Sequence, residues 1–102
     1  MKLEEMLAIL EREEGAKHED EFLKFNKVKN KRSKRPDLHA FLLLEELCPA
    51  KADTVAYACH EKIYLEICPN KLAKKITEEQ VVELLRCGVL YDDESESLFM
   101  FT

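Results

Sequence analysis

Two pairs of short strand-like runs, each pair joined by only a few residues, constrain the fold of this chain more than any other feature. The first pair covers residues 54–59 and 62–67, and the second covers residues 89–91 and 97–102. Short connections join antiparallel neighbours, because parallel strands need a crossover of roughly a dozen residues or more. The sequence therefore predicts an antiparallel sheet of about four strands.

The last run has two apolar faces. Side chains alternate between the two faces of a strand, so Phe99 and Phe101 share one face and Leu98 and Met100 share the other. Two positions in the sheet explain this pattern equally well. The strand lies in the centre, buried on both sides, or it lies at an edge, where a partner strand or a second copy of the chain could add to it.

The helical patterns lie between and before these strands. Thr77 and Gln80 have the spacing of a capping box, and Gly88 follows as a C-terminal cap, so residues 78–87 form the clearest helix. Asp37 is a suitable N-cap for an apolar helix over residues 38–47, and Gly15 marks the end of a helix over residues 2–14. Weaker patterns predict a helix over residues 18–28 and a short helical turn that opens at residues 69–70 and runs through residues 72–75.

These elements predict an α+β fold of two layers, with an antiparallel sheet of two hairpins packed against helices. A length of 102 residues fits a single domain over residues 1–102. Within it, residues 1–36 form a helical N-terminal segment with a basic end. Residues 37–102 form a core of helix, hairpin, helix and hairpin.

Charge is unevenly distributed along the chain. The net charge is −5, but residues 24–35 contain seven cationic residues and no acidic residue. The rest of the chain carries the other nine basic residues against all 21 acidic ones, a net charge of −12. We call residues 24–35 the basic segment; its seven cationic residues are Lys24, Lys27, Lys29, Lys31, Arg32, Lys34 and Arg35.

The basic segment is the candidate contact site for a partner, and several partners fit it. Such a run can bind nucleic acid phosphates, and Phe22 and Phe25 could stack on bases, although the acidic remainder of the chain repels phosphate. It could equally bind an acidic protein partner. It could also dock on the acidic remainder of its own chain or of a second copy, because an exposed loop often has this composition.

The four cysteines are Cys48, Cys59, Cys68 and Cys87. The N-terminus carries acidic residues where an export signal would be apolar, so we expect a cytoplasmic protein with four free thiols in apolar surroundings. No apolar run approaches the roughly 20 residues that span a bilayer, which predicts no contact with a membrane.

A zinc site is the sharpest chemical hypothesis, because Cys59, His60 and Cys68 lie on or beside one predicted hairpin. Its further ligands would be His39, Cys48 and Cys87. The spacing does not favour it, since the cysteines are separated by 10, 8 and 18 residues and structural zinc sites draw on pairs two to four residues apart. A cysteine nucleophile with His39 or His60 lacks a glycine-rich oxyanion loop. We therefore expect no catalytic residue, no metal site and no cofactor.

The remaining candidate binding sites are an acidic turn and one arginine. Asp92, Asp93, Glu94 and Glu96 could bind calcium or a basic partner, but their spacing is not that of a calcium loop and is typical of a solvated turn. Arg86 could contact a ligand anion. More often, an arginine near a helix end complements the helix dipole and pairs locally.

The C-terminal quarter resembles a known group of sequences. Residues 79–102 contain Leu-Leu-Arg-Cys-Gly-Val after the capped helix and close with Ser-Leu-Phe-Met-Phe. This segment resembles small uncharacterised proteins of bacteriophages and prophages. The resemblance implies a structural motif and assigns no activity or functional residue.

These observations predict a protein that acts by binding and not by catalysis. We expect a protein-interaction or regulatory module, encoded by a phage if the resemblance holds, with the basic segment and the first helix as contact surfaces. The alternative is an accessory protein that binds nucleic acid through the basic segment. A homodimer is compatible with both.

Overall fold

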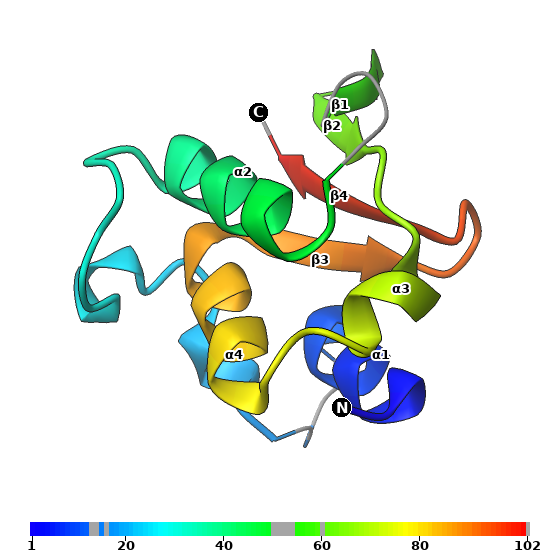
Figure 1. Cartoon of the computed structure of the whole chain (residues 1–102), viewed down its shortest axis with the longest axis horizontal. Coiled ribbons are helices and arrows are strands. Elements are labelled where there is room, and N and C mark those ends of the chain that lie inside the picture. Colours follow the sequence, from blue (N-terminus) through cyan, green and yellow to red (C-terminus); the bar gives the residue numbers. More distant parts are fainter. Residues whose placement is uncertain (13–14, 16, 50–54, 60, 102) are drawn as a thin grey trace.

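The computed structural model confirms the α+β fold (Figure 1). It describes residues 1–12, 15, 17–49, 55–59 and 61–101. The helices are α1 (Leu3–Glu11), α2 (Pro36–Leu47), α3 (Pro69–Ala73) and α4 (Glu78–Cys87), with short 3-10 turns η1 (Glu19–Glu21) and η2 (Phe25–Lys27). The strands are β1 (Val55–Cys59), β2 (Lys62–Leu65), β3 (Val89–Asp92) and β4 (Ser97–Phe101).

The four strands form one antiparallel sheet in the order β1-β2-β4-β3. Both predicted hairpins are present, and β4 lies in the centre, where Met100 is opposite Ile63 on β2 and Val89 on β3. The last strand is therefore central and not an edge strand, but its second apolar face is not fully buried, since Phe101 is 56% exposed.

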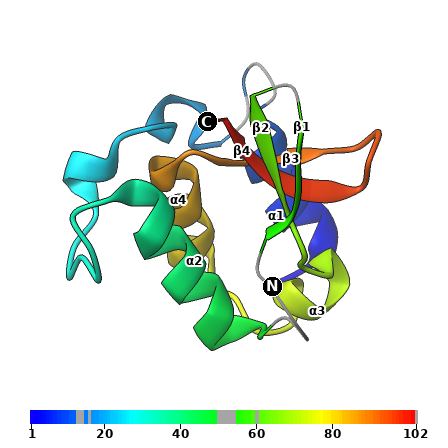
Figure 2. The same cartoon turned by 90° about the horizontal axis from the view of Figure 1, so that it is seen from above.

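One face of the sheet, the inner face, packs against the helices. Leu65, Val89, Leu98 and Met100 are buried there in one core with side chains from all four helices. The two views place α2, α3 and α4 on this side of the sheet (Figures 1 and 2). On the opposite, outer face, Phe99 lies beside Glu11 at the C-terminal end of α1, the helix that contacts the edge strand β3.

Helix α4 follows its predicted boundaries because both of its ends are capped. The Thr77 hydroxyl accepts a hydrogen bond from the Gln80 backbone N–H at 3.2 Å, and the Gln80 side chain accepts one from the Thr77 N–H at 3.0 Å. Gly88 ends the helix in the left-handed region, with φ of 99°. Its buried side chains, among them Val81, Leu84 and Leu85, lie in the core.

Helix α1 is shorter than predicted. Arg12 adopts a left-handed conformation with φ of 55° and its backbone N–H bonds to the Ile9 carbonyl, so the helix ends before Gly15. Residues 13, 14 and 16 lie outside the described residues. Met6, Ile9 and Leu10 are buried against the rest of the core, which leaves the acidic side of α1 exposed.

The predicted helix over residues 18–28 is wrong. The two 3-10 turns η1 and η2 are separated by Leu23, whose φ is 61°. The Leu23 backbone N–H donates to the Leu85 carbonyl at 3.2 Å, at the end of α4. This contact between distant parts of the chain replaces the local helical bonds that the sequence pattern favours.

Helix α2 begins two residues earlier than predicted. Arg35 has the extended geometry of an N-cap, and Pro36 takes the first helical position, where its missing N–H costs nothing. Asp37 therefore lies in the first turn and not at the cap. None of the helices in the described part of the chain has the length and apolar character needed to cross a membrane.

Candidate functional site

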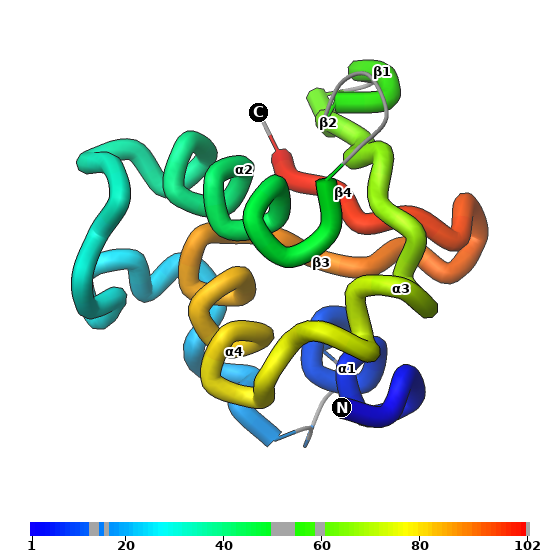
Figure 3. Tube along the Cα trace, in the orientation of Figure 1, coloured from blue at the N-terminus to red at the C-terminus, as the bar shows by residue number. Residues whose placement is uncertain are grey.

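The basic segment lies at the periphery of the molecule. It runs from the end of η1 through η2 to the start of α2 and loops away from the sheet (Figure 3). Val28 is its one buried residue, and most of its other side chains are exposed. The predicted contact residues are thus on the surface.

Four of the seven cations have partners within the chain itself. Lys27 Nζ lies 3.4 Å from Glu21 Oε1, Arg35 pairs with Asp37 at 3.0 Å, and Arg32 pairs with Glu46. The Lys31 ammonium donates to the Val28 carbonyl at 3.2 Å and lies 5.2 Å from the centre of the Phe25 ring. The segment therefore does, in part, dock on the acidic remainder of its own chain.

The other three cations have no such partner. The side-chain ammonium groups of Lys24, Lys29 and Lys34 make no hydrogen bond or ion pair with any residue that the structure describes. They are spread along the segment, so they do not form one compact cationic site.

His39 holds the basic segment against the core. This residue of α2 is only 1% exposed. Its Nδ1 accepts a hydrogen bond from the Arg32 backbone N–H at 3.0 Å, so the ring proton is on Nε2, which lies 2.6 Å from a Glu83 carboxylate oxygen on α4. The Phe25 ring lies edge-on at 5.8 Å. Both ring nitrogens are therefore occupied by structural bonds.

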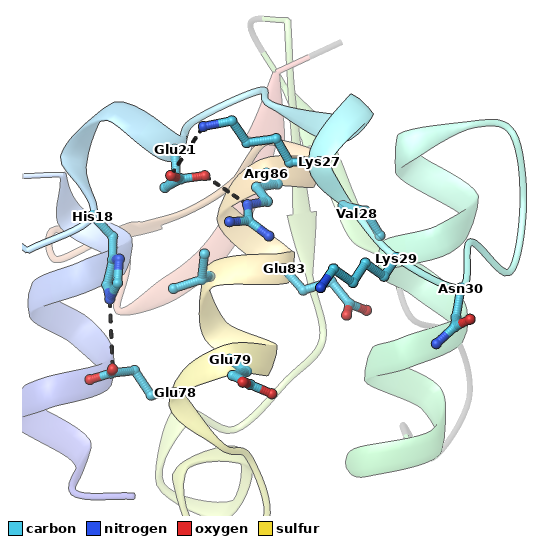
Figure 4. A pocket seen from close by; sticks show the side chains of 11 residues that line it. His18, Glu21, Lys27, Val28, Lys29, Asn30, Glu78, Glu79, Glu83 and Arg86 are labelled. Atoms are coloured by element: carbon cyan, nitrogen blue, oxygen red, sulfur yellow. Dashed lines mark hydrogen bonds and ion pairs between the residues drawn. The ribbon is translucent and has the colours of Figure 1, made fainter.

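A groove of about 650 Å³ lies between α4 and residues 18–30 (Figure 4). Arg86 Nε lies 2.7 Å from Glu21 Oε2, and this hydrogen bond holds the pKa of the Glu21 carboxyl below its usual value. Lys17 pairs with Glu78 at 3.1 Å and likewise lowers the pKa of that carboxyl. Arg86 thus pairs with a carboxylate of its own chain, as such residues usually do.

The groove carries both signs of charge on its walls. Its cations are Lys27, Lys29 and Arg86, and its carboxylates are Glu21, Glu78, Glu79 and Glu83. Because these groups largely compensate one another, the groove selects neither an anion nor a cation. Its pairs fasten residues 17–30 to α4.

Three of the four thiols lie in the described part of the chain. Cys48 and Cys87 are buried and Cys68 is exposed, all three as free thiols. Burial, with a smaller effect of the Glu83 charge, raises the pKa of Cys87 to about 12. His60 and the Cys59 side chain lie outside the described residues. Within the described part of the chain, no three acidic, histidine or cysteine side chains are grouped as metal ligands.

A row of four aromatic side chains crosses the outer face of the sheet. Tyr57 on β1 is opposite Tyr64 on β2, and Tyr64 is opposite Phe99 on β4. The two tyrosine rings stack with centroids 4.6 Å apart, Phe99 follows at 6.0 Å, and Phe101 packs edge-on against Phe99 at 5.3 Å. We call these four residues the aromatic face.

The two ends of the aromatic face are open to solvent. Tyr57 is 52% exposed and Phe101 is 56% exposed. Phe99, in the middle, is only 7% exposed, and Lys62 Nζ lies 4.7 Å from the centre of its ring. Exposed aromatic side chains in mutual contact are a feature of binding surfaces.

The sequence alone contained half of this surface. The alternation in the last run predicts that Phe99 and Phe101 share a face, and this is confirmed. Tyr64 alternates with Ile63 along the second strand-like run and faces Tyr57 of the neighbouring run. The pair Tyr57 and Tyr64 meets the pair Phe99 and Phe101 because β2 lies beside β4, and these strands are separated in sequence by α3, α4 and β3.

A second hollow, of about 320 Å³, lies where the aromatic face meets the β3 side of the sheet. Phe99 and Tyr91 contribute rings to it. Its charged residues are Lys62, Glu11, Asp92 and Asp93. Burial and the surrounding carboxylates raise the pKa of the Tyr91 hydroxyl.

Comparison of the chain with protein-family models, with curated proteins and with solved structures gave no match. The resemblance of residues 79–102 to phage proteins stays a prediction. The function is therefore argued from the geometry of the chain itself.

Proposed function

We propose that this protein is a non-catalytic protein-interaction module and that the aromatic face is its contact surface. The observation that carries the proposal is the row of four rings on the outer face, with Tyr57 and Phe101 half exposed. An antiparallel sheet that packs helices on one side normally presents polar side chains on the other. Here a partner would remove apolar rings from water at a favourable free energy.

Rigidity supports the same proposal. The rings are held by strand pairing and by contact with one another, so little side-chain entropy remains to be lost when a partner binds. Aromatic residues are also the side chains that contribute most to binding at protein interfaces.

The polar groups of the groove and core support a role without chemistry. His39 uses both ring nitrogens to hold Arg32 and Glu83, and Glu21 is bound to Arg86. These side chains are engaged in holding the fold and do not converge on a free reaction site.

The alternative is nucleic acid binding through the basic segment. The ammonium groups of Lys24, Lys29 and Lys34, which have no partner among the described residues, favour it, because each could contact a phosphate. The pairing of the other four cations within the chain and the net charge of −12 elsewhere oppose it.

The test of the proposed function compares two variants in a selection from a display library of random short peptides. Tyr57→Ser with Phe101→Ser removes the open ends of the aromatic face. Leu38→Ser with Leu42→Ser is the matched control, since these α2 side chains are 45% and 47% exposed. We expect the wild type and the control to enrich the same peptides and the face variant to lose them. Selection that is equal in all three proteins would overturn the proposal.

The alternative is tested by light-scattering mass after size exclusion, with a pool of short DNA and RNA at low and high salt. A complex that dissociates with salt and is lost on changing Lys24, Lys29 and Lys34 to alanine would favour nucleic acid binding. A mass that is the same with and without the pool would exclude nucleic acid binding.

A further inference from the structure

On the outer face of the sheet, the charge changes from one end of the strands to the other. Lys62 and Phe101 are opposite each other at one end. At the other end Asp92 is opposite Ser97, and the turn between β3 and β4 follows directly. That turn, residues 93–96, adds the exposed acidic residues Asp93, Glu94 and Glu96. One end of the face is therefore strongly acidic.

The hollow beside Phe99 lies between the two ends, because Lys62 lines it as well as Asp92 and Asp93. A cationic side chain placed there would lie against the Phe99 and Tyr91 rings, among the carboxylates of Glu11, Asp92 and Asp93 and beside the Lys62 ammonium, so that three negative charges face one positive charge. Ring faces and carboxylates both attract an ammonium or guanidinium group. Lys62, whose ammonium is 4.7 Å from the Phe99 ring centre and 5.7 Å from that of Phe101, shows that these rings accept a cation from within the chain.

The size of the face limits the partner. Four strands spaced by about 4.8 Å and about five residues long present a face of roughly 300 Å². A stable interface between two folded proteins buries about 800 Å² on each side. The face is therefore the size of a short peptide segment and is too small to hold a second folded domain by itself.

We propose that the aromatic face binds a short basic segment of a partner protein, with apolar or aromatic side chains on the rings of Tyr57, Tyr64 and Phe101 and a lysine or arginine in the hollow beside Phe99. This inference rests on the proposed function and specifies the chemistry of its partner.

Other occupants fit the charges less well. Single-stranded nucleic acid could stack on the rings, but its phosphates would meet the acidic turn and Asp92. A second copy packed face to face would bring its own acidic turn, and the Lys62 ammonium of each described face would leave an excess of negative charge.

The experiment uses the peptides enriched by the wild-type protein in the display selection. We expect lysine and arginine next to apolar residues to be over-represented, and aspartate and glutamate to be depleted. One enriched peptide is then labelled with fluorescein, and its Kd is measured by anisotropy for wild type and for two charge variants.

The first charge variant is Asp93→Asn with Glu96→Gln, which spares Asp92 because that carboxylate holds the turn through Glu94 and Ser95. The second, Glu4→Gln with Glu5→Gln, removes the same charge from the first turn of α1. We expect the first variant to weaken binding about five- to tenfold, an effect that shrinks as salt rises, and the second to change Kd less than about twofold.

The outcomes separate this inference from the proposed function. Enriched peptides that need the aromatic face but are neutral or acidic, or equal affinities for both charge variants, would overturn the basic partner and leave the interaction module standing. If the wild-type protein enriches no peptide whose binding depends on the aromatic face, both the basic partner and the interaction module are overturned. Binding of single-stranded DNA or RNA that is abolished by Tyr57→Ser with Phe101→Ser would replace the peptide by nucleic acid.

Discussion

His39 connects the basic segment, α2 and α4, and its replacement by leucine tests whether this connection stabilises the fold. Leucine keeps much of the volume and apolar contact of the imidazole in a site that is 1% exposed. It removes the acceptor of the Arg32 backbone N–H and the donor to the Glu83 carboxylate. Both partner groups are then left without their hydrogen bond.

The expected loss of stability follows from these two bonds. The bond between the Arg32 N–H and the neutral ring nitrogen contributes about 1 kcal/mol, and the bond to the Glu83 carboxylate about 1.5 to 3 kcal/mol. The free energy of unfolding should therefore fall by about 2.5 to 4 kcal/mol, a large part of the roughly 5 to 15 kcal/mol of a small domain.

The assay is urea unfolding followed by far-ultraviolet circular dichroism, with hydrogen exchange at the Arg32 amide as a local readout. We expect a lower midpoint at unchanged slope and much faster exchange at Arg32. A change in the free energy of unfolding below about 0.5 kcal/mol, or an Arg32 amide that exchanges as slowly as in the wild type, would refute the role assigned to His39.

Glu83→Gln is the matched control. The glutamine carbonyl still accepts the hydrogen bond from Nε2 of His39, so the expected loss is below about 1 kcal/mol. A loss as large as that of His39→Leu would mean that the charge of Glu83, and not the bond geometry, stabilises the pair.

Three further predictions concern other sites. Because burial raises the pKa of Cys87 to about 12, iodoacetamide at pH 8 should modify exposed Cys68 far faster than Cys87, as site-resolved mass spectrometry would show. The free energy of unfolding should also fall as pH rises above about 9, since only the thiol of the unfolded chain ionises there. Because Arg86 lowers the pKa of Glu21, the pair stabilises the fold above about pH 4.5 and stabilises it less as pH falls below that value. Arg86→Ala should therefore flatten the acidic part of a profile of unfolding free energy against pH. An unchanged profile would contradict the stabilising role of this pair. Gly88→Ala should lower the free energy of unfolding by about 1 kcal/mol or more in urea titrations, since φ is 99° and the new Cβ would lie 2.9 Å from a leucine methyl carbon; a neutral effect would contradict the role of this cap.

Local patterns predicted the elements whose ends are closed by local chemistry. Helix α4 has a capping box and a C-terminal glycine, and its bounds follow from them. The two hairpins follow from short connections and alternation. Where no cap is encoded, as in the stretch around Leu23, the prediction of a helix was wrong, because a hydrogen bond to α4 outweighs the weak local preference.

The candidate sites also divide into features that local sequence predicted and features that only tertiary contacts decided. The sequence identifies the basic segment by charge, but only the structure shows that Arg32 and Arg35 pair within the chain while Lys24 has no described partner. His39 was considered as a ligand or a catalytic group. Its role in holding Arg32 depends on a loop that returns to α2, which no spacing in the sequence reveals.

The sequence by itself therefore determined the α+β class, the hairpins, the capped helix and the uneven charge, because each depends on residues close together in the chain. Only the tertiary structure decided that β4 lies between β2 and β3, that four rings from three strands meet on the outer face, and that His39 joins a loop to two helices. These features arise from contacts between distant residues, whose free energies depend on the packing of the whole chain and not on any local pattern.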